Sequence, residues 1–378
     1  MPRKRVELGM PRMSRSVDPV TIPGRSLPHD GTGDERTRPA SSGLVDTYGR
    51  TATDLRVSLT DFCNLRCTYC MPAQGLDFLR KNQLMSTDEI VRLVDIAVHH
   101  LGVQQVRFTG GEPLTRPELP EILSAVASLS PRPDLSLTTN AIGLDTRAEA
   151  LRQAGLNRVN VSLDSVVSET FERLTRRPLL HRVLDGIDGA LAAGLTPLKV
   201  NAVLMPGIND HEAADLLAWC LDRGLQLRFI EQMPLDAGHT WQRRQIVTAS
   251  DVLDLLSQRF TLTAHSAPRN GSPAELFDVR QAGSSTSDPV LGQVGVIASV
   301  TRPFCGDCRR TRLTAEGRVR TCLFAREETD LLTSLRSGAS DTEIADLWRL
   351  AHWGKQAGHG MNREDFVQPE RPMSAIGG

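Results

Sequence analysis

Short apolar runs alternate with longer amphipathic stretches from about residue 50 to residue 260, and this rhythm limits the possible folds strongly. Each run is rich in Val, Leu, Ile or Phe, as expected for a buried strand. The runs are Leu55–Leu59, Val106–Thr109, Leu135–Thr139, Val159–Leu163, Leu198–Leu204 and Leu227–Ile230. Strands that alternate with helices in this way form a parallel sheet with right-handed crossovers.

The clearest helix is predicted for Ser86–Leu101, where Ser86 and Glu89 have the spacing of a capping box. A closed barrel of eight strand–helix units typically needs about 250 residues. The six units here end near residue 260. The sequence therefore predicts an α/β fold with a partial, TIM-like (β/α)6 barrel, and a flat doubly wound sheet is the alternative.

The composition changes on both sides of this barrel. Residues 1–45 are rich in Pro, Gly, Ser, Arg and Asp, which predicts a disordered or loosely attached leader. We assign residues 46–262 to the barrel and 263–378 to a smaller C-terminal region, with a helix over Asp341–His352. No stretch approaches the roughly 20 apolar residues that span a bilayer, so we expect a cytoplasmic protein without a membrane partner.

Polar and small residues follow the predicted strands. In parallel α/β folds the active site is built at the carboxyl ends of the strands. The segments at those ends are Thr60-Asp61-Phe62-Cys63, Thr109-Gly110-Gly111-Glu112, Thr138-Thr139-Asn140, Ser162-Leu163-Asp164 and Glu231-Gln232-Met233.

Three cysteines, Cys63, Cys67 and Cys70, follow the first strand with the spacing C-x3-C-x2-C. Thiolates favour iron–sulfur clusters, zinc and copper(I). A four-iron cluster normally takes four thiolates, so three would leave one iron open for catalysis. The alternative is a zinc site completed by a distant His or Cys.

A second trio, Cys305, Cys308 and Cys322, has the spacing C-x2-C-x13-C. A zinc ribbon would need a fourth ligand, for which His265 or His352 could serve. Two incomplete sets in one chain are more simply explained by two clusters, each with an open iron. The seventh cysteine, Cys220, lies in an apolar helical run and is predicted to be a buried structural thiol. The odd count and tight clustering favour metal ligation in a reducing compartment over a disulfide framework.

Arginines cluster around the second trio. Arg309, Arg310 and Arg312 follow Cys308 directly, and further arginines close by in the sequence are Arg302, Arg318 and Arg320. Guanidinium groups bind phosphate in a bidentate manner, although they could also balance the charge of a cluster. The formal net charge is −1 and aromatic residues make up 4% of the chain, so we expect no nucleic-acid partner.

These motifs resemble known families. The first trio, with Tyr69 before its last cysteine, resembles the cluster loop of the radical S-adenosylmethionine (SAM) superfamily, and Gly110-Gly111-Glu112-Pro113 resembles its glycine-rich segment. The stretch Gly295–Leu313, Cys322-Leu323-Phe324 and the terminal Gly377-Gly378 resemble the GTP 3′,8-cyclases of molybdenum cofactor biosynthesis. This second resemblance extends from about residue 48 to the end of the chain.

The resemblance implies a role for individual residues. Each cysteine trio would bind a [4Fe-4S] cluster, and the Gly-Gly tail would reach into the active site. The SAM pocket would be lined by Tyr69, Gly111, Ser162 and Met233. GTP would be contacted by Arg56, Arg107, Thr138, Lys199, Arg310 and Arg312, with Arg228 as a further candidate for the triphosphate.

The resemblance also implies the reaction. A 5′-deoxyadenosyl radical would take a hydrogen from the ribose of GTP, and the product would be (8S)-3′,8-cyclo-7,8-dihydroguanosine 5′-triphosphate. An electron donor protein would supply electrons, and a pyranopterin monophosphate synthase would consume the product; a homodimer is compatible with the sequence. Two alternatives are another radical SAM enzyme with an auxiliary cluster that acts on a peptide or nucleotide, and a zinc-stabilised binding module without catalysis.

Overall fold

Twelve strands form a single sheet within residues 41–377, the part of the chain that this computed structural model describes. Most of the predicted leader and the terminal Gly378 lie outside the described residues, and the predicted domain boundaries stay predictions. The six predicted strands are confirmed as neighbours in parallel pairing. They are β3 (Asp54–Ser58), β4 (Gln105–Thr109), β5 (Asp134–Thr139), β6 (Arg158–Ser162), β7 (Lys199–Val203) and β8 (Gln226–Ile230).

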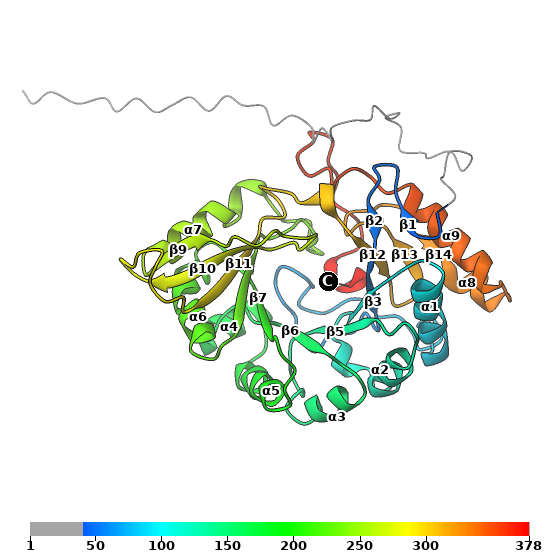
Figure 1. The fold of residues 1–378 in the computed structure, drawn as a ribbon, viewed down its shortest axis with the longest axis horizontal. Coiled ribbons are helices and arrows are strands. Elements are labelled where there is room, and N and C mark those ends of the chain that lie inside the picture. The colour runs from blue at the N-terminus through cyan, green and yellow to red at the C-terminus, as the bar shows by residue number, and fades with distance from the viewer. Residues whose placement is uncertain (1–40, 378) are drawn as a thin grey trace, which may run out of the picture.

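Helices connect these strands and cover one face of the sheet. Figure 1 shows the strands as an incomplete ring with the helices on its outside. The helices are α1 (Thr87–His99), α2 (Leu119–Ala127), α3 (Ala148–Gln153), α4 (Ser168–Thr175), α5 (Leu180–Ala192), α6 (Ala213–Leu221) and α7 (Ala249–Ser257). The predicted capping box is present at the start of α1, where Ser86 and Glu89 each accept a hydrogen bond from the other's backbone. Cys220 is fully buried in α6, as predicted.

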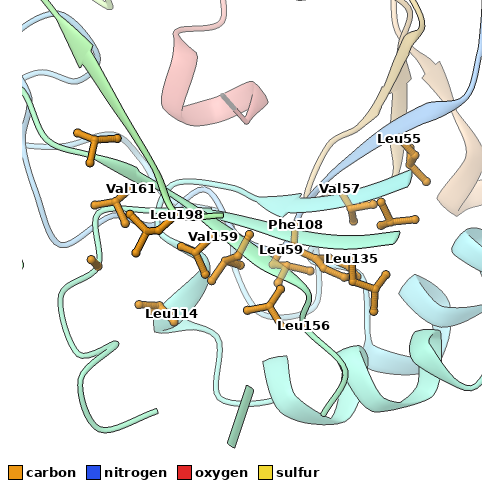
Figure 2. Packing of buried hydrophobic residues seen from close by; sticks show 14 of the residues in the cluster. Leu55, Val57, Leu59, Phe108, Leu114, Leu135, Leu156, Val159, Val161 and Leu198 are labelled. Carbon is orange, nitrogen blue, oxygen red and sulfur yellow. The ribbon is translucent and has the colours of Figure 1, made fainter. Parts of the chain in front are cut away.

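Side chains alternate between the two faces of each strand, as the pleat requires. Leu55, Val57, Phe108 and Val159 project toward the helices, on the face opposite the C-terminal segment (Figure 2). The alternate positions face the interior of the ring and carry polar or charged groups. These are Arg56, Arg107, Ser136, Thr138, Asn160, Lys199, Asn201 and Arg228.

The C-terminal region adds one parallel strand to each side of this arrangement. β11 (Gly292–Ile297) pairs with β8, and β12 (Arg310–Leu313) pairs with β3. Within the described residues β11 and β12 are not neighbours, so the barrel is open, which confirms the predicted partial barrel. Residues 298–309 connect these two strands and carry Cys305 and Cys308.

The remaining elements lie at the two ends of the sheet and around the opening. None of the described helices is long and apolar enough to cross a membrane. The predicted helix over Asp341–His352 is confirmed as α9. The elements are β1 (Leu44–Val45), β2 (Thr51–Ala52), β9 (Phe260–Ala264), β10 (Glu275–Gln281), β13 (Arg318–Arg320), β14 (Thr329–Asp330), α8 (Leu331–Arg336), α9 (Asp341–Trp353) and α10 (Met373–Ile376), with short 3-10 turns at Pro113–Thr115, Asp210–Glu212, Arg243–Gln245 and Cys305–Asp307.

Candidate functional site

The first cysteine loop follows β3 and brings its three thiols together. Cys70 donates a backbone hydrogen bond to the carbonyl of Cys67 at 3.0 Å, which forms a tight turn. Burial raises the pKa of the Cys67 thiol well above its ordinary value, and the neighbouring thiols of Cys70 and Cys63 raise it further. The three thiols therefore lie close enough to interact, as a shared iron–sulfur cluster would require.

The glycine-rich segment after β4 packs directly against this loop. Gly111 donates to the carbonyl of Thr60 at 2.7 Å, and Glu112 donates to the carbonyl of Phe62 at 2.7 Å. A Cβ atom on Gly111 would lie only 2.2 Å from the carbonyl oxygen of Phe62. Glycine is needed here because any side chain would push the two loops apart.

Glu112 is buried at the point where these loops meet. Its carboxylate accepts hydrogen bonds from the backbone of Leu114 at 2.9 Å, the hydroxyl of Thr139 at 2.7 Å and the backbone of Asn140 at 2.7 Å. Burial raises the pKa of Glu112 to about 7, although these hydrogen bonds oppose the rise. The side chain of Asn140 in turn donates to Asn64 in the cysteine loop at 2.7 Å. Glu112 thus ties the ends of β4 and β5 together beside the cysteine loop.

A second buried carboxylate lies after β6. The Tyr69 hydroxyl donates to Oδ2 of Asp164 at 2.6 Å, and the backbone of Val203 donates to Oδ1 at 2.8 Å. Burial raises the pKa of Asp164 to about 6. Tyr69 and Gly111 therefore lie on or against the first cysteine loop, whereas Ser162 is exposed at the end of β6. Met233 packs against a small apolar cluster formed by Leu235, Leu323 and Ile376.

The second cysteine pair lies between β11 and β12, in surroundings of opposite charge. Arg310 Nη2 and Lys355 Nζ each lie 3.4 Å from Cys308 Sγ. Burial raises the pKa of Cys308, but these two cations overcome it and bring the value to about 6. The thiols of Cys322 and Cys308 act electrostatically on Cys305, so this trio also lies together.

Each trio can be tested as a binding site for a single metal ion. Within residues 41–377, no three Cys, His, Asp or Glu side chains form a group that could hold one metal ion. A four-iron cluster binds its thiolates through different iron atoms, so three neighbouring cysteines need not meet at one point. His265, a candidate zinc ligand, pairs with Asp278 at 2.9 Å next to the β9–β10 hairpin. His352, the other candidate, is fully buried on α9.

Buried and half-buried cations line the interior of the ring between the two trios. The sheet register places Arg312 beside Arg56, Arg56 beside Arg107, and Arg107 beside Ser136. Arg228 on β8 donates to Asn201 at 2.9 Å and to Asn160 at 2.7 Å. These cations come from neighbouring strands and face one interior.

Burial and repulsion between neighbouring cations lower the pKa values of these side chains. Burial and the neighbouring Arg107 lower the pKa of Arg56 to about 9. Burial, followed by Arg228, lowers the pKa of Lys199 to about 8. Burial likewise lowers the pKa values of Arg107 and Arg228 to about 10 each. Asp54 raises the pKa values of Arg56 and Arg107 in part, but the pKa values of all four cations stay below their ordinary range.

Two of these interior groups have buried donors without a partner. Within the described part of the chain, Nε of Arg56 and Nδ2 of Asn160 are buried and make no hydrogen bond. Leaving a buried donor unpaired costs about 1–3 kcal/mol. These donors point to an acceptor that residues 41–377 do not supply.

The other arginines around the second trio are paired with carboxylates. Arg302 pairs with Glu275 at 3.1 Å, and Arg309 pairs with Asp307 at 3.4 Å. Arg318 and Arg320 pair with Asp330 and Glu328. Closeness in sequence groups these arginines together, but it does not report which of them carboxylates already pair; Arg320 even lies opposite Arg312 in the sheet register. Of this group, Arg310 and Arg312 are the two directed to the site.

The C-terminal tail lies inside the ring, near its centre in Figure 1. Arg312 Nη1 donates to the carbonyl of Gly377 at 2.9 Å, and Ser58 Oγ donates to that of Ile376 at 3.3 Å. A Cβ atom on Gly377 would lie 1.8 Å from Ser58 Oγ. The described part of the tail therefore reaches the interior, and glycine is required for that approach.

Several residues of the site were not singled out as contacts by the sequence. Asp164, Glu112 and Asn140 lie in strand-end segments that were recognised, but their buried hydrogen bonds depend on the tertiary structure. Asn160 and Asn201 could have been found from strand alternation, because they share the inward face of their strands. Lys355 gives no such signal, since it lies 47 positions from the cysteine that it contacts.

Comparison with known proteins gives two family matches. Residues 57–220 match the model of the radical SAM superfamily, and residues 225–361 match the model named Molybdenum Cofactor Synthesis C. A GTP 3′,8-cyclase of Streptomyces coelicolor is 61% identical over 343 residues, which cover 90% of this chain and 98% of the relative. A GTP 3′,8-cyclase of Paenarthrobacter nicotinovorans is 59% identical over 351 residues, which cover 90% of this chain and 99% of the relative.

A solved structure shows the same fold. Streptococcus suis SuiB bound to S-adenosylmethionine has a TM-score of 0.58 and 14% identity, covering 83% of this chain and 69% of SuiB. At that identity the likeness concerns the fold.

Proposed function

We propose, because this chain belongs to the GTP 3′,8-cyclase family of radical SAM proteins, that it binds GTP inside the open barrel and converts this GTP to (8S)-3′,8-cyclo-7,8-dihydroguanosine 5′-triphosphate. The observation that supports this most directly is the concentration of positive charge on half-buried side chains between the two cysteine trios. A triphosphate would neutralise that charge and accept hydrogen bonds from the unpaired donors.

The residues present fit the two [4Fe-4S] clusters and the SAM that this family uses. Cys63, Cys67 and Cys70 would hold one cluster; Cys305, Cys308 and Cys322 would hold the other. When bound, the first cluster and SAM supply the one-electron cleavage chemistry that starts the reaction. The chain's own residues bind, orient and shield the reactants.

The SAM site would lie beside the first cysteine loop. Gly111 leaves room for a ligand close to the backbone because it has no Cβ atom. Tyr69 is held in place by Asp164, and Glu112 fixes Asn140 against the loop. We propose that Met233 and Ser162 line the outer part of this pocket, where the strands β6 and β8 end.

The GTP site would lie on the inward faces of the strands. Arg56, Arg107 and Lys199 would bind the triphosphate, with Arg228 as a further partner. Thr138 pairs in register with Asn160, which places its hydroxyl on the same inward face. The guanine would lie toward the second trio, near Arg310 and Arg312. The tail and the surrounding strands would exclude water from the reacting carbons.

The wider reaction sequence follows from the same proposal. An electron donor protein would be required, and a pyranopterin monophosphate synthase would consume the cyclic product. A homodimer is compatible with this proposal.

The decisive experiment uses anaerobic protein with both clusters reconstituted, supplied with GTP, SAM and a reductant. We expect 5′-deoxyadenosine and a cyclic product that has the same mass as GTP, because the hydrogen lost from the ribose is replaced by one electron and one proton, and that is separated from GTP by chromatography. Formation of 5′-deoxyadenosine that does not depend on GTP, with no nucleotide product, would favour a radical SAM enzyme with another substrate. Zinc without iron in anaerobically purified protein would favour the non-catalytic alternative.

The positively charged interior is tested separately by Arg56→Gln. Loss of a charge-assisted hydrogen bond of about 1.5–3 kcal/mol should weaken GTP binding by roughly 10- to 150-fold. The matched control is Arg223→Gln, because Arg223 is exposed and stacks on Trp219 at 4.3 Å. Equal GTP affinity in the two variants, measured by equilibrium dialysis, would contradict the proposed triphosphate site.

A further inference from the structure

Lys355 is a buried cation that contacts Cys308 of the second cysteine pair. It follows α9 and is 2% exposed. Its Nζ donates to Cys308 Sγ at 3.4 Å and to the carbonyl of Arg310 at 2.8 Å. An ammonium group has three donors and no acceptor, so both contacts direct positive charge toward the thiolate and the strand that follows it.

A second buried cation, Arg50, fixes the segment that carries Lys355. Arg50 lies before β2 and is 7% exposed. Its Nη1 donates to the carbonyls of Cys305 and Ala357, each at 2.7 Å, and its Nη2 donates to that of Gln356 at 2.6 Å. Asp46 accepts from Nε of the same arginine at 2.5 Å. The position of Lys355 relative to the cysteine pair is therefore set by contacts from three distant parts of the chain.

A positively charged hydrogen-bond donor to a cysteine sulfur that binds a cluster raises the reduction potential of that cluster. Adding an electron makes a cluster more negative, and a nearby positive charge stabilises that reduced form. Hydrogen bonds to the sulfurs are among the factors that set the reduction potential of iron–sulfur clusters. The effect is large where water is excluded, and Lys355 is almost completely buried.

We propose that Lys355 is a positioning residue that raises the reduction potential of the second cluster by donating a charged hydrogen bond to Cys308. This inference rests on the proposed function, since it takes Cys308 as a cluster ligand. Lys355 and Arg310 then have different roles: Arg310 also faces the interior where GTP would bind, whereas the side chain of Lys355 contacts the Cys308 thiol and the backbone carbonyl of Arg310.

The test uses the full-length chain with Cys67→Ala, in which the second cluster gives the only iron–sulfur signal. The midpoint potential is measured by anaerobic redox titration followed by electron paramagnetic resonance. Lys355→Met should lower the ratio of reduced to oxidised cluster at a fixed potential about tenfold, which corresponds to about 59 mV for one electron. Lys355→Arg should restore most of the potential. Lys81→Met, which removes an exposed lysine before α1, should leave it unchanged.

The possible outcomes separate the two proposals. Failure of the Cys67→Ala protein to hold about four irons would contradict the proposed function, not the role of Lys355. An unchanged potential in Lys355→Met with full iron content would overturn the role of Lys355. If Lys355→Met does not assemble its cluster, Lys355→Gln keeps a neutral donor, and an unchanged potential there would overturn it equally. Loss of the cluster in all three Lys355 variants would also overturn it, because the residue would then serve assembly and not potential.

Discussion

The two cysteine trios have the same ligand chemistry but opposite electrostatic surroundings. Burial and Glu112 raise the pKa of Cys63 to about 12, and burial and Asp164 raise that of Cys67 well above its ordinary value. At the second trio, Arg310 and Lys355 overcome burial and bring the pKa of Cys308 to about 6. Carboxyl groups thus act on the thiols of the first loop, where Arg66 opposes them only weakly at Cys63, whereas cations dominate at Cys308, although burial keeps the pKa of Cys305 above its ordinary value.

This difference shows how one barrel can separate two ligands. SAM carries a positive sulfonium group and an ammonium group, which suit the carboxyl-rich loop near Glu112 and Asp164. GTP carries a triphosphate, which suits the cations on the strands between the trios. Two sets of equivalent thiolates would not make this distinction, so the residues around them must provide it.

The largest expected effect comes from removing one cysteine of each trio in turn. Cys67→Ala should lose about four irons and all formation of 5′-deoxyadenosine, because the first cluster is needed to cleave SAM. Cys308→Ala should also lose about four irons, yet it should still cleave SAM while forming no cyclic nucleotide. Iron analysis and chromatography of the reaction products distinguish these results.

Cys220→Ala is the matched control, since Cys220 is buried in α6 outside both trios. It should keep the full iron content and both products. Complete loss of SAM cleavage in Cys308→Ala would show that the trios do not have the separate roles that their surroundings indicate.

A smaller effect is expected on the pH dependence of stability at the first loop. The pKa of Glu112 is about 7 in the folded protein, above its ordinary value of 4.5. The folded state therefore binds this proton more tightly, and the stabilisation that is present below pH 4.5 is lost as the pH rises through 7. The loss amounts to about 3 kcal/mol at most, from 1.36 kcal/mol per unit of pKa.

Glu112→Gln should remove this part of the pH dependence because an amide does not titrate. The measurement is the difference in anaerobic melting temperature between the two proteins from pH 5 to pH 8. Glu118→Gln is the control, since Glu118 is more exposed and its pKa is lowered. A difference between wild type and Glu112→Gln that stays constant across this range would mean that Glu112 is ionised throughout.

Local patterns in the sequence predicted the central part of the fold. Each of β3 to β8 is an apolar run whose alternate residues pack on helices, so periodicity identifies it without reference to its neighbours (Figure 2). The pairing of β11 with β8 and of β12 with β3 was not predicted. Those pairings join segments far apart in the chain, and no local pattern specifies a distant partner.

In the candidate site, too, the sequence predicted what local patterns specify and missed what distant contacts specify. Closely spaced cysteines and the Gly110-Gly111 pair could be recognised, because cluster loops and close backbone approach require particular residue types at short range. The contacts of Lys355 and Arg50 with the second trio could not, since each depends on how the chain ends fold back over the barrel. The pairing of Arg302 and Arg320 with carboxylates could not be predicted either, because their partners are set by the tertiary structure and not by sequence distance.

The smallest expected effect concerns thiol reactivity in metal-free protein at pH 7. Cys308, with a pKa of about 6, is mostly thiolate, whereas Cys70, whose pKa burial raises to about 11, is ionised in about one molecule in ten thousand. Nucleophilicity falls as pKa falls, so the difference in alkylation rate should shrink to roughly a hundredfold.

Timed alkylation with iodoacetamide, followed by peptide mass spectrometry, measures both sites in one sample. Lys355→Met should slow alkylation of Cys308 and leave Cys70 unaffected, because Lys355 contacts only the second trio among the six clustered cysteines of the described chain. The exposed Lys81 provides the matched variant, Lys81→Met, which should change neither rate. Equal rates for Cys308 and Cys70 in wild-type protein would mean that the cations at the second trio do not offset its burial, and the contrast between the two trios would be lost.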